Sequence, residues 1–311
     1  MDIFEEQRFD RMEDFLKAIS YGGKLYKLLE KGNHIYRGQA SDKYELVPSA
    51  LRHKSQELFD KVALQGSLNS EIEYNQILNE YLTIKEFYKI CDKESLAVPN
   101  IDRIRTTIND TMDLDTMLSK EDWLPYDLWE IAALAQHYGL PTRLLDWSHD
   151  LYIALYFAIE NYLDDRIVPD GTNYIVLWIL NLPLLTPVHN SSFPLRIIQP
   201  TYHGNPNLAA QQGLFTMWQT KKEINLHPNG GMYVNVEKKI NRTPLDTLLR
   251  EYTGNELQAF GLKMIKILLP LEGINELYKF LSINGYTAAR AYPGYYGAAK
   301  SIKHLQVIKE R

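Results

Sequence analysis

The hydrophobic residues after position 148 repeat with the period of an α-helix. They recur at i, i+3, i+4, i+7 and i+8, the spacing of one buried helical face, as Leu151, Ala154, Leu155, Ala158 and Ile159. This spacing predicts a helix over residues 149–161, with Ser148 as its N-cap. Residues 126–138 predict a second helix, which ends at Gly139 because a proline follows two residues later. We expect residues 142–146, between the two helices, to form a short buried strand.

Apolar runs elsewhere in the chain predict further elements. Short runs favour strands at 35–39, 174–180, 214–219, 232–236 and 262–269. Longer patterns favour helices at 2–31 (with a break at Gly22-Gly23), 55–118, 244–252, 274–283 and 295–309. Residues 185–212 contain proline and asparagine and are expected to be irregular, and long loops of this kind are often functional.

The order of these elements indicates an α+β fold in a single domain over residues 1–311. The sheet is expected to be interrupted by a helical insertion over roughly 53–125. The strand-rich half covers roughly 142–270.

Four polar residues crowd the corner between the two central helices, namely His137, Arg143, Asp146 and Ser148. Burying such groups is costly unless they are paired or used, so the corner is a candidate functional site. Structural interpretations stay open beside the functional one. In the structural interpretation, Ser148 serves purely as a helix N-cap, and Arg143 and Asp146 form an ion pair that fixes the corner. His137 then satisfies backbone groups at the C-terminus of a helix.

The same stretch carries a family resemblance. The run QHYGLPTRLLDWS at 136–148, followed by ALYFA at 154–158, resembles the signature of the FRG domain family. Tyr36-Arg37-Gly38 matches the aromatic-Arg-Gly motif from which that family takes its name. Two supporting segments follow in the expected order, at 211–215 and 285–298. The resemblance therefore spans roughly positions 35 to 305.

Composition narrows the classes of function. The chain has 311 residues, 45% hydrophobic and 23% charged, with a net charge of −5 and a pI of about 5.9. This acidity argues against a protein that coats nucleic acid non-specifically through a broad basic face. It is compatible with a local basic groove. One cysteine, Cys91, excludes an internal disulfide.

The apolar segments of the chain bear on its location. The start of the sequence has no apolar leader, and the longest apolar run, 174–185, is too short to span a bilayer. We therefore expect a cytoplasmic protein that does not associate with a membrane.

Several common catalytic signatures are missing from the sequence. We find no Walker GxxxxGK[ST], GxGxxG, HExxH or GxSxG motif. With one cysteine and eight scattered histidines, no metal site is expected.

A more distant resemblance links the chain to ADP-ribosyltransferases and implies their split mixed sheet. In those enzymes a first-strand arginine holds NAD, a serine-containing strand precedes a helix, and a later Glu or Gln orients the nicotinamide ribose. Here Tyr36-Arg37-Gly38 resembles the first motif, Asp146-Trp147-Ser148 the second, and Gln212 the third. Arginine presents a planar fork of donors that matches phosphates. Because Gln212 is uncharged, Asp146 is expected to supply negative charge to an oxocarbenium-like transition state.

The resemblance implies a set of site residues. The catalytic candidates are Arg37, Asp146, Ser148 and Gln212. The candidates for binding NAD, with Tyr36 and Tyr138 as stacking surfaces, are Tyr36, Arg37, Gly38, His137, Tyr138, Arg143 and Gln211.

We therefore expect an NAD-dependent ADP-ribosyltransferase, a toxin or antiviral-defence effector without a metal. Its acceptor would be a macromolecule, with nucleic acid favoured over protein, and a neutralising antitoxin is an expected partner. The first alternative is an NAD-independent module that binds or cleaves nucleic acid, which its lysine pairs and many tyrosines would suit. The second is a non-enzymatic interaction domain in which the polar corner serves stability alone.

Overall fold

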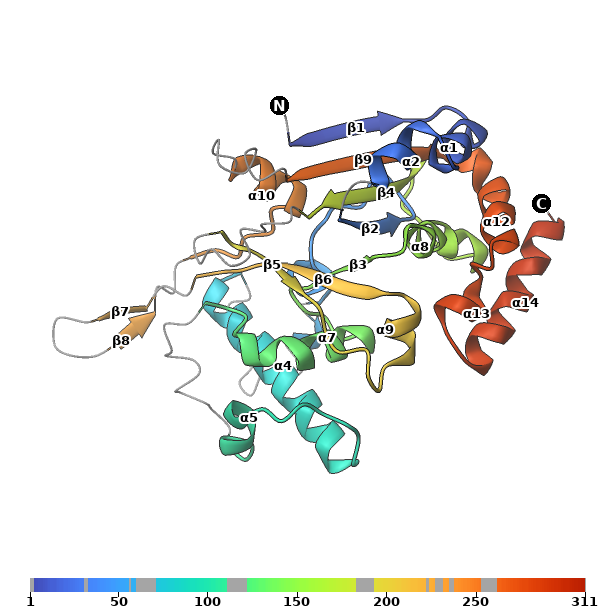
Figure 1. Ribbon diagram of the computed structural model, residues 1–311. Coiled ribbons are helices and arrows are strands. Elements are labelled where there is room, and N and C mark those ends of the chain that lie inside the picture. Colours follow the sequence, from blue (N-terminus) through green and yellow to red (C-terminus); the bar gives the residue numbers. More distant parts are fainter. Residues whose placement is uncertain are drawn as a thin grey trace.

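The fold is α+β and is built on a mixed sheet of seven strands in the order β1-β9-β4-β2-β3-β6-β5 (Figure 1). The computed structural model describes residues 3–30, 33–55, 57–59, 71–110, 122–182, 193–221, 224–226, 232–234, 238–252 and 262–310. β1 runs parallel to β9, and the other neighbouring strands of this sheet are antiparallel. The strands are β1 (Phe4–Arg8), β2 (His34–Gln39), β3 (Leu145–Ser148), β4 (Tyr174–Asn181), β5 (Leu195–Ile198), β6 (Gly213–Trp218) and β9 (Lys263–Pro270).

Helices flank this sheet, and a small hairpin stands apart from it (Figure 1). The hairpin pairs β7 (Ile224–Leu226) with β8 (Met232–Val234). The helices are α1 (Met12–Ile19), α2 (Lys24–Leu29), α4 (Glu73–Lys93), α5 (Asp102–Thr106), α7 (Trp129–His137), α8 (Leu151–Leu163), α9 (Pro206–Ala210), α10 (Leu245–Glu251), α12 (Ile274–Ile283), α13 (Ala288–Ala291) and α14 (Tyr295–Glu310).

The two faces of the sheet are covered differently. On one face a single apolar cluster runs from β9 to β5 and packs against α10, because alternate strand residues such as Met264, Val176, Ile35, Trp147 and Leu214 all point there. On the opposite face the apolar residues form two separate clusters. One joins α1, α8 and α12 to β4 and β9, and the other joins α4 and α7 to β5 and β6. The boundary between these two helical layers lies over β2 and β3.

The sheet is weakly paired at this boundary. β2 and β4 share six registered residue pairs, from His34↔Asn181 to Gln39↔Val176. β2 and β3 share one registered pair, Tyr36↔Ser148. Beyond that pair, the Arg37 side chain bridges the strands, since its Nη1 donates to the backbone oxygen of Asp146 over 2.7 Å. The sheet therefore opens next to Arg37.

Gly38 holds β2 tightly against α8. A Cβ at this position would overlap the carbonyl oxygen of Ala154 and the amide nitrogen of Ala158. Glycine is thus required here because two backbones approach each other closely. This contact fixes how far the strand that carries Arg37 lies from α8.

Most elements with a clear period match their predicted positions, and three segments differ. Residues 4–8 were expected to be helical but form β1, because they pair with β9 near the other end of the chain. The strand expected at 142–146 begins instead at Leu145. Residues 185–212 were expected to be irregular, but their described part contains β5 and α9. Within the helical insertion, α4 and α5 are confirmed, and its segments 60–70 and 111–121 lie outside the described residues.

The cap of α8 also differs from the prediction. Asp150, and not Ser148, is the N-cap, since its carboxylate accepts hydrogen bonds from the amides of Tyr152 and Ile153. Ser148 stays on β3, where its hydroxyl is used in another way.

Candidate functional site

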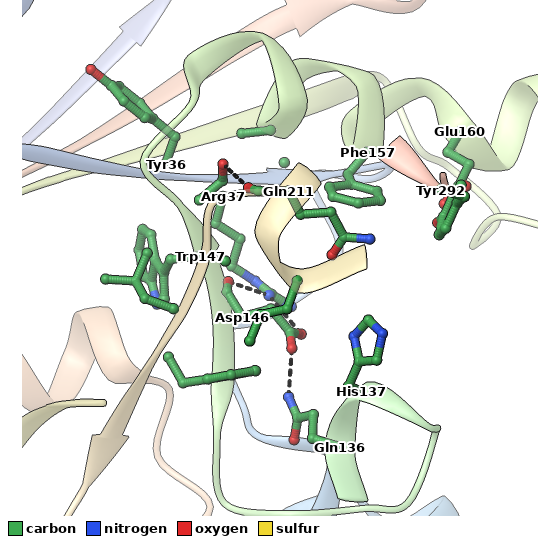
Figure 2. Close-up of a pocket in the computed structure, with 17 residues that line it drawn as sticks. Tyr36, Arg37, Gln136, His137, Asp146, Trp147, Phe157, Glu160, Gln211 and Tyr292 are labelled. Carbon is green, nitrogen blue, oxygen red and sulfur yellow. Dashed lines mark hydrogen bonds and ion pairs between the residues drawn. The ribbon is translucent and has the colours of Figure 1, made fainter. Parts of the chain in front are cut away.

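A pocket of about 340 Å³ lies where the sheet opens, between the two helical layers (Figure 2). Its size falls in the range of small-molecule sites. Its floor comes from β2, β3 and β6, and its walls come from α7, α8, α9 and the segment before α14. Seven of the predicted site residues line it, namely Tyr36, Arg37, Gly38, His137, Asp146, Ser148 and Gln211.

Arg37 is the central cation of the pocket. Its side chain is 15% exposed, and besides the backbone of Asp146 its Nη1 reaches the Asp146 carboxylate over 3.3 Å. Its Nε is buried and has no hydrogen-bond partner among the described residues. A buried donor without a partner costs free energy unless a ligand or water satisfies it. Because Arg37 lines the pocket and its side chain is partly exposed, an acceptor in the pocket can reach its guanidinium charge.

Asp146 supplies the opposite charge and is held from two sides. One carboxylate oxygen faces Arg37, and the other accepts a hydrogen bond of 2.8 Å from Nε2 of Gln136 (Figure 2). Gln136 is itself fixed, since it donates to the backbone oxygen of Leu144 and accepts from the hydroxyl of Thr142. The Asp146 side chain is still 60% exposed, so it points a positioned carboxylate toward solvent.

Ser148 connects the pocket floor to the loop before β6. Its hydroxyl donates to the backbone oxygen of Gln211 over 2.7 Å and accepts from the amide of Asp150 over 2.9 Å. With its residue only 3% exposed, this hydroxyl is engaged in the protein. Ser148 thus positions Gln211 and the start of α8.

The two adjacent glutamines have different environments. Gln211 lines the pocket, and its Nε2 donates to the backbone oxygen of Ala291 over 3.1 Å. Gln212 is exposed, does not line the pocket, and has a positive φ of 45° in the turn before β6. The structure therefore brings Gln211, rather than Gln212, to the other site residues.

The adjacent residues His137 and Tyr138 also have different environments. His137 lines the pocket, and burial lowers its pKa below the usual value, with Asp146 opposing the shift. Its imidazole is therefore neutral at neutral pH and can accept a proton. Tyr138 is 67% exposed and does not line the pocket. Tyr36 does line it, and burial, followed by the charge of Asp150, raises its pKa to about 12.

Sequence reasoning missed a second carboxylate at the pocket. Glu160 of α8 is 7% exposed, and it accepts hydrogen bonds from the hydroxyl of Tyr292 over 2.7 Å and from Nζ of Lys300 over 2.6 Å. Although burial opposes it, hydrogen bonds to Asp164 and Glu160 raise the pKa of Lys300, so its charge is retained. The available signal was that Glu160 is the one charged residue in the largely apolar helix 151–163.

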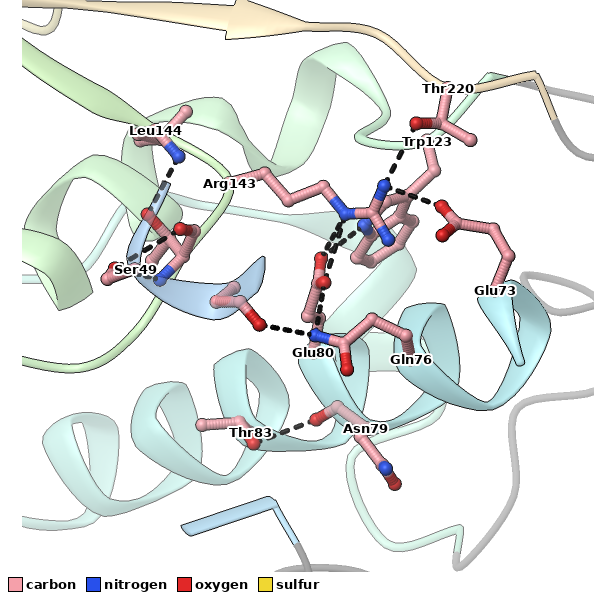
Figure 3. A network of polar contacts seen from close by, with 12 residues as sticks. Ser49, Glu73, Gln76, Asn79, Glu80, Thr83, Trp123, Arg143, Leu144 and Thr220 are labelled. Atoms are coloured by element: carbon pink, nitrogen blue, oxygen red, sulfur yellow. Dashed lines mark hydrogen bonds and ion pairs between the residues drawn. The ribbon is translucent and has the colours of Figure 1, made fainter. Parts of the chain in front are cut away.

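Arg143 lies outside the pocket, in a buried network of its own (Figure 3). It is 4% exposed, and it pairs with Glu73 over 2.6 Å and with Glu80 over 2.8 Å. Glu80 also accepts from the indole nitrogen of Trp123 over 2.7 Å. The alternative in which Arg143 pairs with Asp146 is thus wrong, because two carboxylates of α4 hold its guanidinium. Arg143, a predicted NAD-binding residue, does not line the pocket.

Comparisons with known proteins give one match. The model of the FRG domain family matches residues 32–166, which include Arg37, His137, Asp146 and Glu160. Gln211 and Tyr292, which complete the pocket, lie outside the matched range. No curated protein and no solved structure matches the chain. Among the described residues, none of the helices combines the length and apolar character that a membrane crossing requires.

Proposed function

We propose that this chain, which carries an FRG domain in residues 32–166, is an NAD-dependent ADP-ribosyltransferase. One observation carries the proposal. A partly buried arginine with an unpartnered Nε, a carboxylate and a neutral histidine meet in one pocket, where β2 and β3 share a single registered pair. The order of motifs along the chain agrees with this function. Arg37 comes on a first strand, Asp146 and Ser148 on a second, and Gln211 before a third.

The pocket residues suit the parts of NAD. Arg37 would bind a phosphate, because its partly exposed guanidinium brings positive charge and a planar fork of donors to the pocket. Phe157 and Tyr292 give apolar surface for a flat ring. When bound, NAD supplies a glycosidic bond whose cleavage leaves positive charge on the ribose.

Each polar residue then has a defined task. Asp146 presents negative charge next to the ribose, held in place by Gln136. Gln211 accepts from or donates to the ribose hydroxyls, in the place first expected of Gln212. His137 accepts the proton of the attacking acceptor group, since its neutral form has a free lone pair. Ser148 acts as a positioning residue through the backbone of Gln211.

The transfer is tested by incubating the purified protein with NAD labelled on the adenylate and a whole-cell lysate. We expect macromolecular label that requires the protein and disappears in an Arg37→Ala variant. Label that resists protease but is lost on nuclease treatment identifies a nucleic-acid acceptor, and the reverse pattern identifies a protein acceptor. The proposal fails if neither fraction is labelled and NAD does not raise the melting temperature of the protein.

This function would make the protein a toxin or defence effector. Modification of an essential macromolecule harms the cell that contains the enzyme, so a neutralising protein is expected to accompany it. The expectation is tested by induced expression. The wild-type chain should slow growth, and the Arg37→Ala chain at equal abundance should not.

A further inference from the structure

A second and larger cavity adjoins the pocket. It has a volume of about 700 Å³ and shares Arg37, Gly38 and Phe157 with the pocket, so the two form adjoining parts of one depression. We call this second cavity the basic groove. Its other walls are the end of β2, the segment 43–54 and Arg242.

Positive side chains are concentrated in the basic groove. Its lining contains Arg37, Lys43, Arg52, Lys54 and Arg242, together with His53, against a single carboxylate, Glu45. The chain as a whole carries a net charge of −5, so this concentration is opposite to its average. Positive walls around a concave surface focus the field and attract anions.

Two of these cations have no acidic partner in the part of the chain that the structure describes. Lys43 pairs with Asp42 over 3.4 Å, and Arg242 pairs with Glu71 over 2.7 Å. Arg52 donates only to a backbone oxygen, that of Val47, and no carboxylate contacts Lys54. Desolvation, and then the positive charge of Arg37, lower the pKa of Arg52, and the charge of Asp146 only partly opposes the shift. An anion between Arg37 and Arg52 would therefore stabilise both charges.

Aromatic surface accompanies the charge. Tyr44 lines the basic groove and is 38% exposed, and Phe157 lies where the groove meets the pocket. Cationic side chains that follow a phosphodiester chain, with aromatic rings on which bases stack, are the usual means of binding single-stranded nucleic acid. An acidic peptide would use the cations but gain little from the exposed ring.

We infer that the basic groove binds the backbone of a single-stranded nucleic acid and leads its reactive group into the pocket. The inference rests on the proposed transferase activity only for what happens in the pocket. Binding in the groove requires no NAD. A single-stranded nucleic acid is then the class of acceptor, which the pocket residues alone leave open.

The test measures binding of a fluorescent single-stranded oligonucleotide of about 12 nucleotides, within the range of known single-strand sites. RNA and DNA of one mixed sequence are titrated without NAD at several salt concentrations. The groove variant is Arg52→Gln/Lys54→Gln. The control is Lys279→Gln/Lys303→Gln, which removes the same charge from exposed positions that line neither cavity. A polyglutamate peptide of equal length serves as the protein-like polyanion.

We expect the groove variant to weaken oligonucleotide binding about tenfold at low salt, and the control to change it less than twofold. Loss of two phosphate contacts should also reduce the slope of log K against log salt by about 1.4, since each contact contributes about 0.7 for single strands. Equal losses in both variants, or equal binding of polyglutamate, would overturn the inference. Salt-sensitive binding that depends on Arg52 and Lys54, in a protein that transfers no label from NAD, would support the groove and refute the transferase.

Discussion

Arg37 lies at the pocket and Arg143 lies outside it, and the two arginines serve different purposes. Arg143 is enclosed by Glu73 and Glu80, both of them buried, so two carboxylates compensate its single charge. Arg37 faces a mostly exposed Asp146 at 3.3 Å and keeps a buried Nε without a partner among the described residues. Arg143 connects α4 to the segment before β3, and Arg37 lies at the pocket, where a ligand can reach its charge. Each arginine keeps one buried nitrogen without a partner among the described residues, Nε in Arg37 and Nη2 in Arg143. Compensation of the charge by buried carboxylates, and a place at the pocket, therefore distinguish the structural arginine from the functional one.

The largest effect is expected from Arg143→Ala. Removal of this cation leaves Glu73 and Glu80 buried without compensation, which typically costs about 3–5 kcal/mol of unfolding free energy. Urea denaturation followed by tryptophan fluorescence measures the loss. Arg105→Ala is the matched control, since it removes a surface pair with Asp92 that is expected to contribute less than about 1 kcal/mol. If Arg143→Ala lowered the unfolding free energy less than Arg105→Ala does, the network would not be needed for stability.

A smaller effect is expected from Arg37→Lys, and it should appear in binding rather than in stability. Lysine keeps the charge but loses the planar fork and the Nε donor. We expect NAD affinity to fall about tenfold, equivalent to about 1.4 kcal/mol, with the unfolding free energy changed by less than about 1 kcal/mol. Calorimetric titration and urea denaturation give the two quantities. A large loss of stability would place Arg37 in the same class as Arg143.

The pH dependence of activity should report His137. Burial lowers its pKa from the usual 6.5, so the imidazole is neutral at pH 7 and gains a proton only below its lowered pKa. As the proton acceptor it is active when neutral, so the rate should be constant near pH 7 and fall only when the pH drops through the lowered pKa, which lies below 6.5. Nicotinamide release, measured from about pH 5 to pH 8, tests this. A His137→Gln variant should lose most activity and show no such fall, and an unchanged profile would exclude His137 as the base.

The smallest effects are expected at the paired glutamines. Gln211→Ala should weaken NAD binding severalfold, because it removes a side chain from the pocket wall. Gln212→Gly should leave binding unchanged and shift stability by about 1 kcal/mol or less, because glycine adopts its positive φ without strain. The reverse pattern in calorimetric titrations would show that Gln212 carries the ribose contact.

Sequence periodicity predicted the elements whose partners are local or whose pattern is strong. β2, α8, β4, β9 and α12 lie close to their expected bounds, because strand alternation and helical spacing reflect one buried face. β1 was missed because a short strand at a sheet edge owes its form to β9, which no local pattern reveals. β3 was placed too early because Thr142 and Arg143, apparently part of a buried run, point into separate side-chain networks.

The candidate site was predictable to the same degree. Arg37, Asp146, His137 and Gln211 were found because motifs carry them, and the fold brings them together. Gln212 could not be distinguished from Gln211, since one residue of register decides which side chain reaches the pocket. Arg143 was included because its partners, Glu73 and Glu80, come from a distant segment that no local pattern connects to it. Glu160 and Tyr292 were missed because their contact joins α8 to a segment 132 residues later.

The most direct test of the account is calorimetric titration of NAD into three forms of the protein: wild type, Arg37→Ala and the control Arg105→Ala. Loss of charge-assisted hydrogen bonds worth about 1.5–3 kcal/mol each should weaken binding roughly tenfold to a hundredfold in Arg37→Ala. The control should bind like wild type, and all three proteins should remain folded by circular dichroism. Equal affinities for NAD in Arg37→Ala and wild type, or absence of binding to the folded wild-type protein, would contradict the assignment of this pocket to NAD.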